Sequence, residues 1–124
     1  FEPGKQFSYN NGDYVLLGRI IEKITGKSFS QNLEDAILRP LQMENTNMLY
    51  SKDIITGLAD TYNIDDSTQV FYKDDPMYIE NYFSAGAMYS TVEDLLKFDE
   101  GIFSHKLLGK KTVELMLTPY PELY

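Results

Sequence analysis

The chain has 124 residues, of which 43% are hydrophobic and 24% are charged, a composition typical of one globular domain large enough to bury a core. Its formal net charge is −8, and residues 41–100 carry twelve carboxylates against three lysines, which argues against a nucleic-acid partner because phosphate contacts need clustered Lys and Arg. The absence of cysteine excludes disulfides and thiolate chemistry, and no apolar run reaches membrane-spanning length.

A Pro-Gly turn and an aromatic-rich extended segment open the chain and lead into the first predicted helix. Asn10 or Asn11 can cap this helix, Asp13 lies in its first turn, and Gly26 is a suitable C-terminal stop. Apolar side chains occupy so much of its circumference that we expect it to be a central helix of the fold. These side chains are Tyr14, Val15, Leu16, Leu17, Ile20, Ile21 and Ile24.

A second helix is predicted from a capping box at residues 28–31 to Arg39. Pro40 is expected to end it, because the residue before a proline avoids helical backbone angles. Residues 41–50 then read as turn and extended structure. The apolar face of the helix is predicted to comprise Phe29, Leu33, Ala36 and Ile37.

The acidic middle of the chain predicts little regular structure. Residues 52–60 could form a short helix, although Thr56 and Gly57 disfavour it. Residues 61–64 and 69–72 flank a turn and predict a hairpin or an irregular excursion. The carboxylates between residues 60 and 80 do not match the calcium-loop pattern, so we expect them to be solvated. A turn at 73–76 and an aromatic run at 77–83 follow.

Two more helices are predicted in the last third of the chain. A capping box at residues 90–93 opens a helix that runs to about Phe103, and a short helix at about 110–117 ends before Pro119. His105, the only histidine, lacks metal-ligand spacing and is expected at the surface. The fold predicted for residues 1–124 is therefore mainly helical, with one small hairpin. The apolar positions are Val92, Leu95, Leu96, Ile102 and Phe103, expected to be buried, and Val113, Met116 and Leu117 in the last helix.

Tyr9 and Asn11 are the main candidate site residues. Because they lie two positions apart in an extended segment, their hydroxyl and amide groups are expected on the same side of the chain. The helix that follows has free N–H groups and a dipole that favour negative charge near them. A structural interpretation competes with this one, in which Asn11 is only a helix cap and Tyr9 a packed aromatic. Periodicity alone favours the structural interpretation.

Three stretches of the sequence carry motifs that occur together in one enzyme family. Residues 1–11 read F-x-P-G-x-x-F-x-Y-x-N, and residues 12–26 continue as G-x-Y-x-x-L-G-x-I-I-E-x-x-T-G. Residues 37–46 are similar to I-x-x-P-L-G-M-x-x-T, and residues 84–95 to A-G-G-x-x-S-T-x-x-D-L. With these stretches in this order, the chain resembles the serine β-lactamase and penicillin-binding protein family. More narrowly, it resembles the branch of class C β-lactamases, DD-peptidases and esterases, in which Tyr-x-Asn replaces Ser-Asp-Asn.

The resemblance implies a fold and roles for three residues. The fold would be the all-α subdomain of the β-lactamase/transpeptidase-like fold. Tyr9 would relay protons between nucleophile, lysine and leaving group, and Asn11 would bind a substrate carbonyl. The loop at Gly86 would form a wall of the substrate cleft, although a glycine before a capped helix is as often a backbone requirement. The implied parent is a bacterial, extracytoplasmic serine hydrolase that forms an acyl-enzyme with a β-lactam, a D-Ala-D-Ala peptide or a small ester. No cofactor is implied.

Two family signatures are missing from this sequence. None of its eight serines has a lysine three residues later, and neither Lys-Thr-Gly nor His-x-Gly occurs, because Lys111-Thr112 is followed by Val113. We therefore expect the chain to be a helical subdomain without its nucleophile and sheet domain, and to be inactive alone. The alternative is a non-catalytic module that keeps this scaffold for ligand sensing or protein contact.

The expected partners follow from this interpretation. They are a small-molecule or peptide substrate of the parent and the missing sheet domain of the same protein, with no nucleic acid and no membrane span. We also expect a homodimer of the free chain, formed through aromatic residues that would otherwise border the sheet domain. These residues are Tyr78, Tyr82, Phe83 and Tyr89 in the segment 77–89, and Tyr120, Leu123 and Tyr124 in the tail 118–124.

Overall fold

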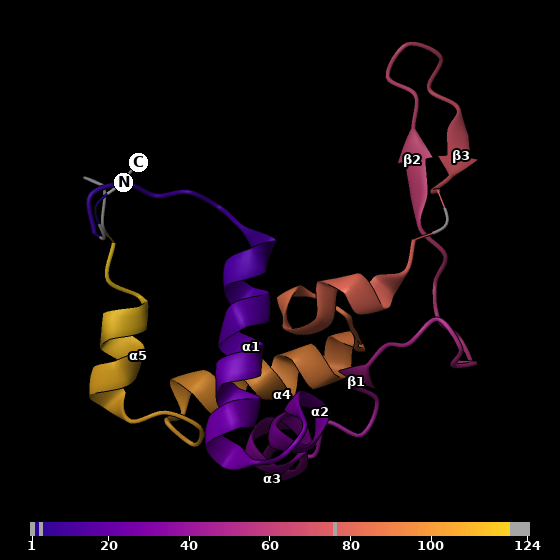
Figure 1. Cartoon of the computed structure of the whole chain (residues 1–124). Coiled ribbons are helices and arrows are strands. Elements are labelled where there is room, and N and C mark those ends of the chain that lie inside the picture. Colours follow the sequence, from indigo (N-terminus) through magenta and orange to yellow (C-terminus); the bar gives the residue numbers. More distant parts are fainter. Residues whose placement is uncertain (1, 3, 76, 120–124) are drawn as a thin grey trace.

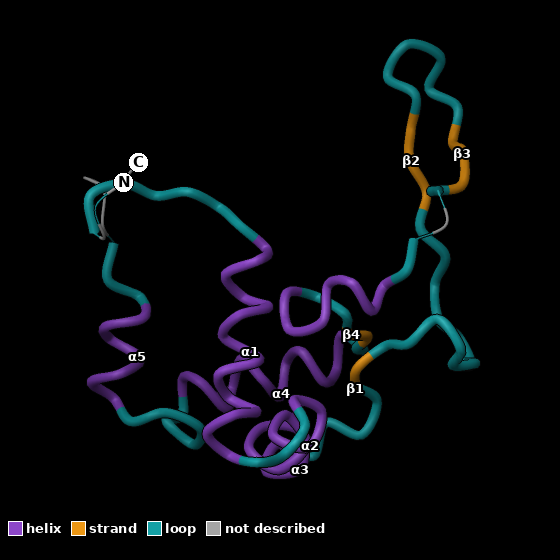
Figure 2. The backbone as a smooth tube through the Cα atoms, viewed as in Figure 1, coloured by secondary structure: helices purple, strands orange, loops and turns teal. Residues whose placement is uncertain are grey.

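The computed structural model describes residues 2, 4–75 and 77–119 and shows a mainly helical body from which a two-stranded arm projects (Figure 1). The predicted fold class is confirmed. Both small sheets are antiparallel, β1 with β4 and β2 with β3, and Figure 2 marks all four strands. The strands are β1 (Asn47–Met48), β2 (Tyr62–Ile64), β3 (Phe71–Lys73) and β4 (Met88–Tyr89). The helices are α1 (Asn11–Thr25), α2 (Phe29–Leu33), the π-helix η1 (Glu34–Leu38), α3 (Arg39–Leu41), the 3-10 helix η2 (Ile79–Ala85), α4 (Val92–Phe103) and α5 (Lys110–Met116).

Helix α1 has the predicted bounds but is not a central helix. Its cap is Asn10, whose Oδ1 accepts a hydrogen bond from the Gly12 N–H at 2.8 Å, and it ends at Gly26 with φ 67°. Gly18 is its one buried residue, while the Leu16 and Ile24 side chains are 60% and 79% exposed. The prediction failed because, within the described chain, only the face around Gly18 is covered, by η2.

The second helix begins as predicted but does not end at Pro40. The capping box is formed, because Ser28 Oγ accepts from the Gln31 N–H and Gln31 Oε1 accepts from the Ser28 N–H. The chain then widens into the π-helix η1, in which the Arg39 N–H bonds to the Glu34 carbonyl five residues back, and continues through Pro40 to Leu41. A proline ring collides with the carbonyl four residues back in an α-helix. The wider turn changes that register and lets the helix pass the proline.

The core lies where α2, η1 and α3 meet β1 and the segment before β4. It contains Leu38, which was not predicted for the apolar face, whereas the predicted Ala36 is exposed. Helix α4 packs on this core through Gly101 and Ile102, with Gly101 beside Leu41. The buried cluster comprises Leu33, Leu38, Leu41, Met43, Met48 and Ala87.

The middle of the chain forms the predicted hairpin but not the predicted short helix. Residues 52–60 form turns, with Gly57 at φ 79°, a backbone angle that an α-helix does not contain. Strands β2 and β3 pair with Asn63 opposite Tyr72, and the arm they form stands away from the helices (Figure 2). At its tip, Asp65 Oδ1 accepts hydrogen bonds from the Ser67 hydroxyl and from the Ser67 and Thr68 N–H groups. These bonds, that of the hydroxyl first, lower the pKa of Asp65 to about 2.

Helix α4 ends at Phe103 as predicted but begins one residue later and faces the other way. Its cap is Thr91, not Ser90, and Thr91 Oγ1 accepts from the Asp94 N–H at 3.3 Å. Of the five side chains expected to be buried, only Ile102 is, and the buried face is instead that of Asp94, Gly101 and Ile102. The exposed ones are Val92, Leu95, Leu96 and Phe103.

The remaining predictions concern the end of the chain. Helix α5 matches the prediction to within one residue and buries Val113, and His105 is exposed as expected. Within residues 2, 4–75 and 77–119, no helix combines the length and apolar character needed to cross a membrane. The tail residues 120–124 lie outside the described residues.

Candidate functional site

Tyr9 and Asn11 lie side by side, as their spacing predicts. The Tyr9 hydroxyl donates a hydrogen bond to Asn11 Oδ1 at 3.0 Å. Tyr9 is 72% exposed, so it is not a packed aromatic, and Asn10 rather than Asn11 caps the helix. Both parts of the competing structural interpretation are therefore wrong.

The local backbone explains how this pair is presented. Asn10 is extended, with φ −152° and ψ 118°, and Asn11 is the first residue of α1. Among the described residues, Asn11 Nδ2 makes no hydrogen bond, so its N–H groups can bind a carbonyl oxygen. The pair also lies at the positive end of the α1 dipole. The arrangement combines one hydroxyl, able to accept and pass on a proton, with one amide donor.

Gly86 lies in the loop between η2 and β4. Its φ of 154° and ψ of 5° suit a glycine, so the backbone requirement anticipated from the sequence is present. No atom within 4 Å would meet an added Cβ, and Gly86 is exposed. The open space leaves room for a ligand beside this loop.

Asp94 joins the second and third motif stretches, a role that the sequence reasoning missed. Its side chain is fully buried and accepts from the Asn45 N–H at 2.7 Å, from Thr46 Oγ1 at 2.9 Å and from Lys97 Nζ at 2.7 Å. Thr46 Oγ1 also lies 2.7 Å from Ser90 Oγ. The only available signal was that Thr46 and Asp94 are the polar residues at corresponding ends of two motif stretches.

The environment of Asp94 favours its charged form. Burial alone would raise the pKa of this carboxyl, but the hydrogen bonds from Lys97, the Asn45 N–H and Thr46 outweigh it and lower the pKa below its usual value. An ionised carboxylate with this many donors is a structural clasp, and it holds the segment that leads from Gly86 to α4.

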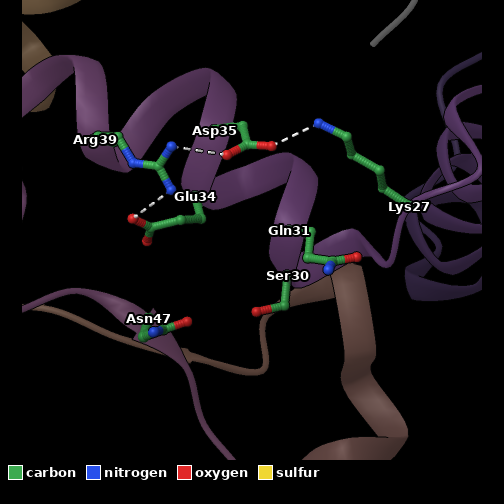
Figure 3. Close-up of a pocket in the computed structure, with 7 residues that line it drawn as sticks. All are labelled: Lys27, Ser30, Gln31, Glu34, Asp35, Arg39 and Asn47. Atoms are coloured by element: carbon green, nitrogen blue, oxygen red, sulfur yellow. Dashed lines mark hydrogen bonds and ion pairs between the residues drawn. The ribbon is translucent and has the colours of Figure 1, made fainter.

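Neither of the two largest hollows in the described chain contains Tyr9 or Asn11. One lies along α2 and η1 (Figure 3), where Asp35 pairs with Lys27 at 2.7 Å and with Arg39 at 3.2 Å. Lys27 first, and then Arg39, lowers the pKa of Asp35. Because these charges pair with one another at the surface, we interpret the hollow as a solvated ion-pair network.

The second hollow is a larger groove at the base of the arm. Residues 55–61 and 73–75 line one side and residues 88–91 the other, directly after Gly86. Within the described ranges, no three His, Cys, Asp or Glu side chains are grouped so that they could hold a metal ion.

Comparison with known proteins gives consistent matches. A family model described as Beta-lactamase matches residues 1–122. Teichoic acid D-alanine hydrolase of Staphylococcus aureus (strain MRSA252) is 30% identical over 125 residues, which cover 97% of this chain and 31% of that protein. Among solved structures, a D-stereospecific amidohydrolase from Streptomyces sp. is similar with a TM-score of 0.81 and 26% identity, over 97% of this chain and 36% of that one.

A third relative is D-amino acid amidase from Ochrobactrum anthropi SV3, solved in complex with D-phenylalanine. It is similar with a TM-score of 0.75 and 29% identity, over 92% of this chain and 35% of that chain. The chain thus spans about a third of the length of each of these relatives.

Proposed function

Because the chain belongs to the beta-lactamase family, we propose that it is the helical part of a serine hydrolase that cleaves D-aminoacyl esters or amides. The observation that carries the proposal is the Tyr9–Asn11 hydrogen bond at the start of α1, in a chain matched by the family model over residues 1–122. The substrate class is supported by the three relatives, whose names all specify a D-amino acid or D-stereospecificity.

In the proposed mechanism, the nucleophilic serine and its lysine lie in a part of the protein outside this chain. The serine oxygen attacks the D-aminoacyl carbonyl, and its proton passes through the Tyr9 oxygen to the leaving alcohol or amine. The Asn11 amide donates a hydrogen bond to a substrate carbonyl and holds it in line. Water then cleaves the acyl-enzyme and releases the D-amino acid. The Gly86 loop forms one wall of the cleft.

The first prediction concerns covalent labelling by fluorescent penicillin. The 124-residue chain is expected to remain unlabelled, because no serine in it has a lysine three residues later. The full-length protein that carries the chain is expected to gain one adduct per molecule and to hydrolyse a D-alanyl ester. Intact-mass spectrometry of both proteins measures this, and stoichiometric labelling of the 124-residue chain would contradict the proposal.

The non-catalytic alternative makes a different prediction in the same experiment. A sensing or interaction module on this scaffold would lack Ser-x-x-Lys in its flanking sequence as well. Such a full-length protein would bind a D-amino acid ligand reversibly, with no adduct and no turnover. The flanking sequence and the mass measurement therefore distinguish the two functions.

A second prediction concerns self-association of the 124-residue chain. The segment 77–89 is less exposed than expected, since Tyr78 is exposed but Tyr82, Phe83 and Tyr89 are half-buried, and Tyr120, Leu123 and Tyr124 lie outside the described residues. Other large apolar side chains take their place in the argument. They are Leu16, Leu17, Ile20 and Ile24 on α1 and Leu95, Leu96 and Phe103 on α4, all exposed.

We expect these surfaces to meet the sheet domain in the full-length protein and a second copy in the free chain. Sedimentation over a concentration series should show a mass rising from 14.3 kDa towards twice that value, despite the net charge of −8. The full-length protein is the control, and its sheet domain should suppress this association. A free chain that stays monomeric at high concentration would contradict the missing-domain proposal.

A further inference from the structure

Phe83 has the most unusual backbone among the described residues without glycine's freedom. Its φ is 42° and its ψ is −121°, and it interrupts η2 as a kink. A bulky side chain costs energy in this region and remains there only where its surroundings hold it. The kink leads directly into the Gly86 loop, because the Phe83 carbonyl accepts a hydrogen bond from the Ala87 N–H at 3.0 Å. The position of the loop is thus tied to this strained residue.

Side chains of α1 and α2 hold the Phe83 ring. The Arg19 guanidinium lies over the ring, 4.1 Å from its centroid, and the Phe29 ring packs against it at 5.3 Å. Glu22 organises both contacts, since one carboxylate oxygen accepts from Arg19 and the other from the Phe29 N–H, each at 2.8 Å. Arg19 first, and then the Phe29 N–H, lowers the pKa of Glu22, so the acceptor stays charged.

Gly18 brings the kink against α1. It is the buried residue of that helix, and a Cβ there would overlap Ser84 Oγ and lie 2.8 Å from Phe83 Cε1. The absence of a side chain lets the Ser84 hydroxyl reach the helix and donate to the Tyr14 carbonyl at 2.7 Å. Gly18 therefore sets how closely η2 approaches α1.

We propose that Gly18 and Phe83 are positioning residues for the reaction, because together they fix the Gly86 loop relative to the Tyr9–Asn11 pair. Asn11 begins the same rigid helix seven residues before Gly18, which is about 10 Å along the axis. A shift of the kink against α1 moves the cleft wall against the proton relay without touching either. This inference rests on the proposed function.

The kinetic test uses the full-length protein and a D-alanyl ester, with active sites counted by penicillin labelling. Gly18→Ala is expected to lower kcat per labelled site by about 10- to 100-fold, since displacements near 1 Å have effects of that size. The matched control is Gly109→Ala, whose Cβ would meet nothing within 4 Å. An unchanged kcat per labelled site, with only the melting temperature lowered, would overturn the proposal.

Two Phe83 variants keep the test informative if Gly18→Ala does not fold. Phe83→Gly suits the backbone angles but removes the ring, and it should lower kcat by about 10-fold or more. Phe83→Tyr keeps the ring between Arg19 and Phe29, and should retain kcat to within about threefold. Equal kcat values for the two variants would show that the ring does not position the loop.

Hydrogen exchange separates failure of this inference from failure of the proposed function. The Ala87 N–H, bonded to Phe83, should exchange at least about tenfold faster in Gly18→Ala than in Gly109→Ala, with or without substrate. If the wild type has no esterase activity, the proposed function fails, and this measurement still decides whether Gly18 fixes the loop. Equal exchange rates in the two variants would refute the inference even in an active enzyme.

Discussion

Tyr9→Phe is expected to lower kcat of the full-length protein by about 10²- to 10⁴-fold, the range typical of a lost proton relay. The melting temperature should hardly change, because the hydroxyl is exposed and its hydrogen-bond partner in the described chain is the neighbouring Asn11. The measurement is steady-state hydrolysis of a D-alanyl ester, together with thermal unfolding of both proteins.

Tyr62→Phe is the matched control, since it removes the same atom from an exposed tyrosine on the projecting arm. It should leave both kcat and the melting temperature unchanged. If Tyr9→Phe lost stability and kept its turnover, Tyr9 would be a packing residue, and the proton-relay role would have to be abandoned.

Asp94→Ala is expected to lower the free energy of unfolding by about 3 kcal/mol or more, as removal of one partner from a buried charged network usually does. The substitution leaves Thr46, the Asn45 N–H and Lys97 without their common acceptor. Asp99→Ala is the control, because Asp99 is an exposed carboxylate on the same helix. Urea unfolding at neutral pH compares the three proteins.

The stabilisation by Asp94 should also depend on pH, in a known direction. Its pKa is lowered in the folded state, so its contribution is fully present above the ordinary Asp value of 3.8 and is lost as the pH falls through the lower folded value. The stability difference between wild type and Asp94→Asn should therefore be constant from pH 7 to about 5 and shrink towards pH 2. A difference that grows on acidification would mean that the buried carboxylate is not the stabilising form.

Local signals predicted the helices because each is encoded within a few residues. The Ser28 capping box and the Gly26 stop need only hydrogen bonds along their own segment, and both are present. The hairpin likewise follows from two short extended runs around a turn. The Tyr9–Asn11 contact belongs to the same class, since extended geometry alone brings residues two apart together.

Burial could not be predicted in this way, because it depends on which surfaces meet. The apolar stripes of α1 and α4 are real, yet in the described chain these helices bury Gly18 and Asp94 instead. A buried glycine and a buried carboxylate carry no hydrophobic signal. The partners of Asp94 lie 48 or 49 residues away at Thr46 and Asn45, so no periodicity reveals them.

The π-helix η1 gives this part of the molecule two helical wheels instead of one. The buried leucines fall at positions 33, 38 and 41, so the first interval is five residues, one more than an α-helical stripe would allow. Everything after residue 38 is thus rotated by about 100° relative to a single wheel drawn from residue 29. A redesign of this surface must treat residues 29–33 and 39–41 as separate phases, because one continuous wheel would send the outward-facing changes into the core.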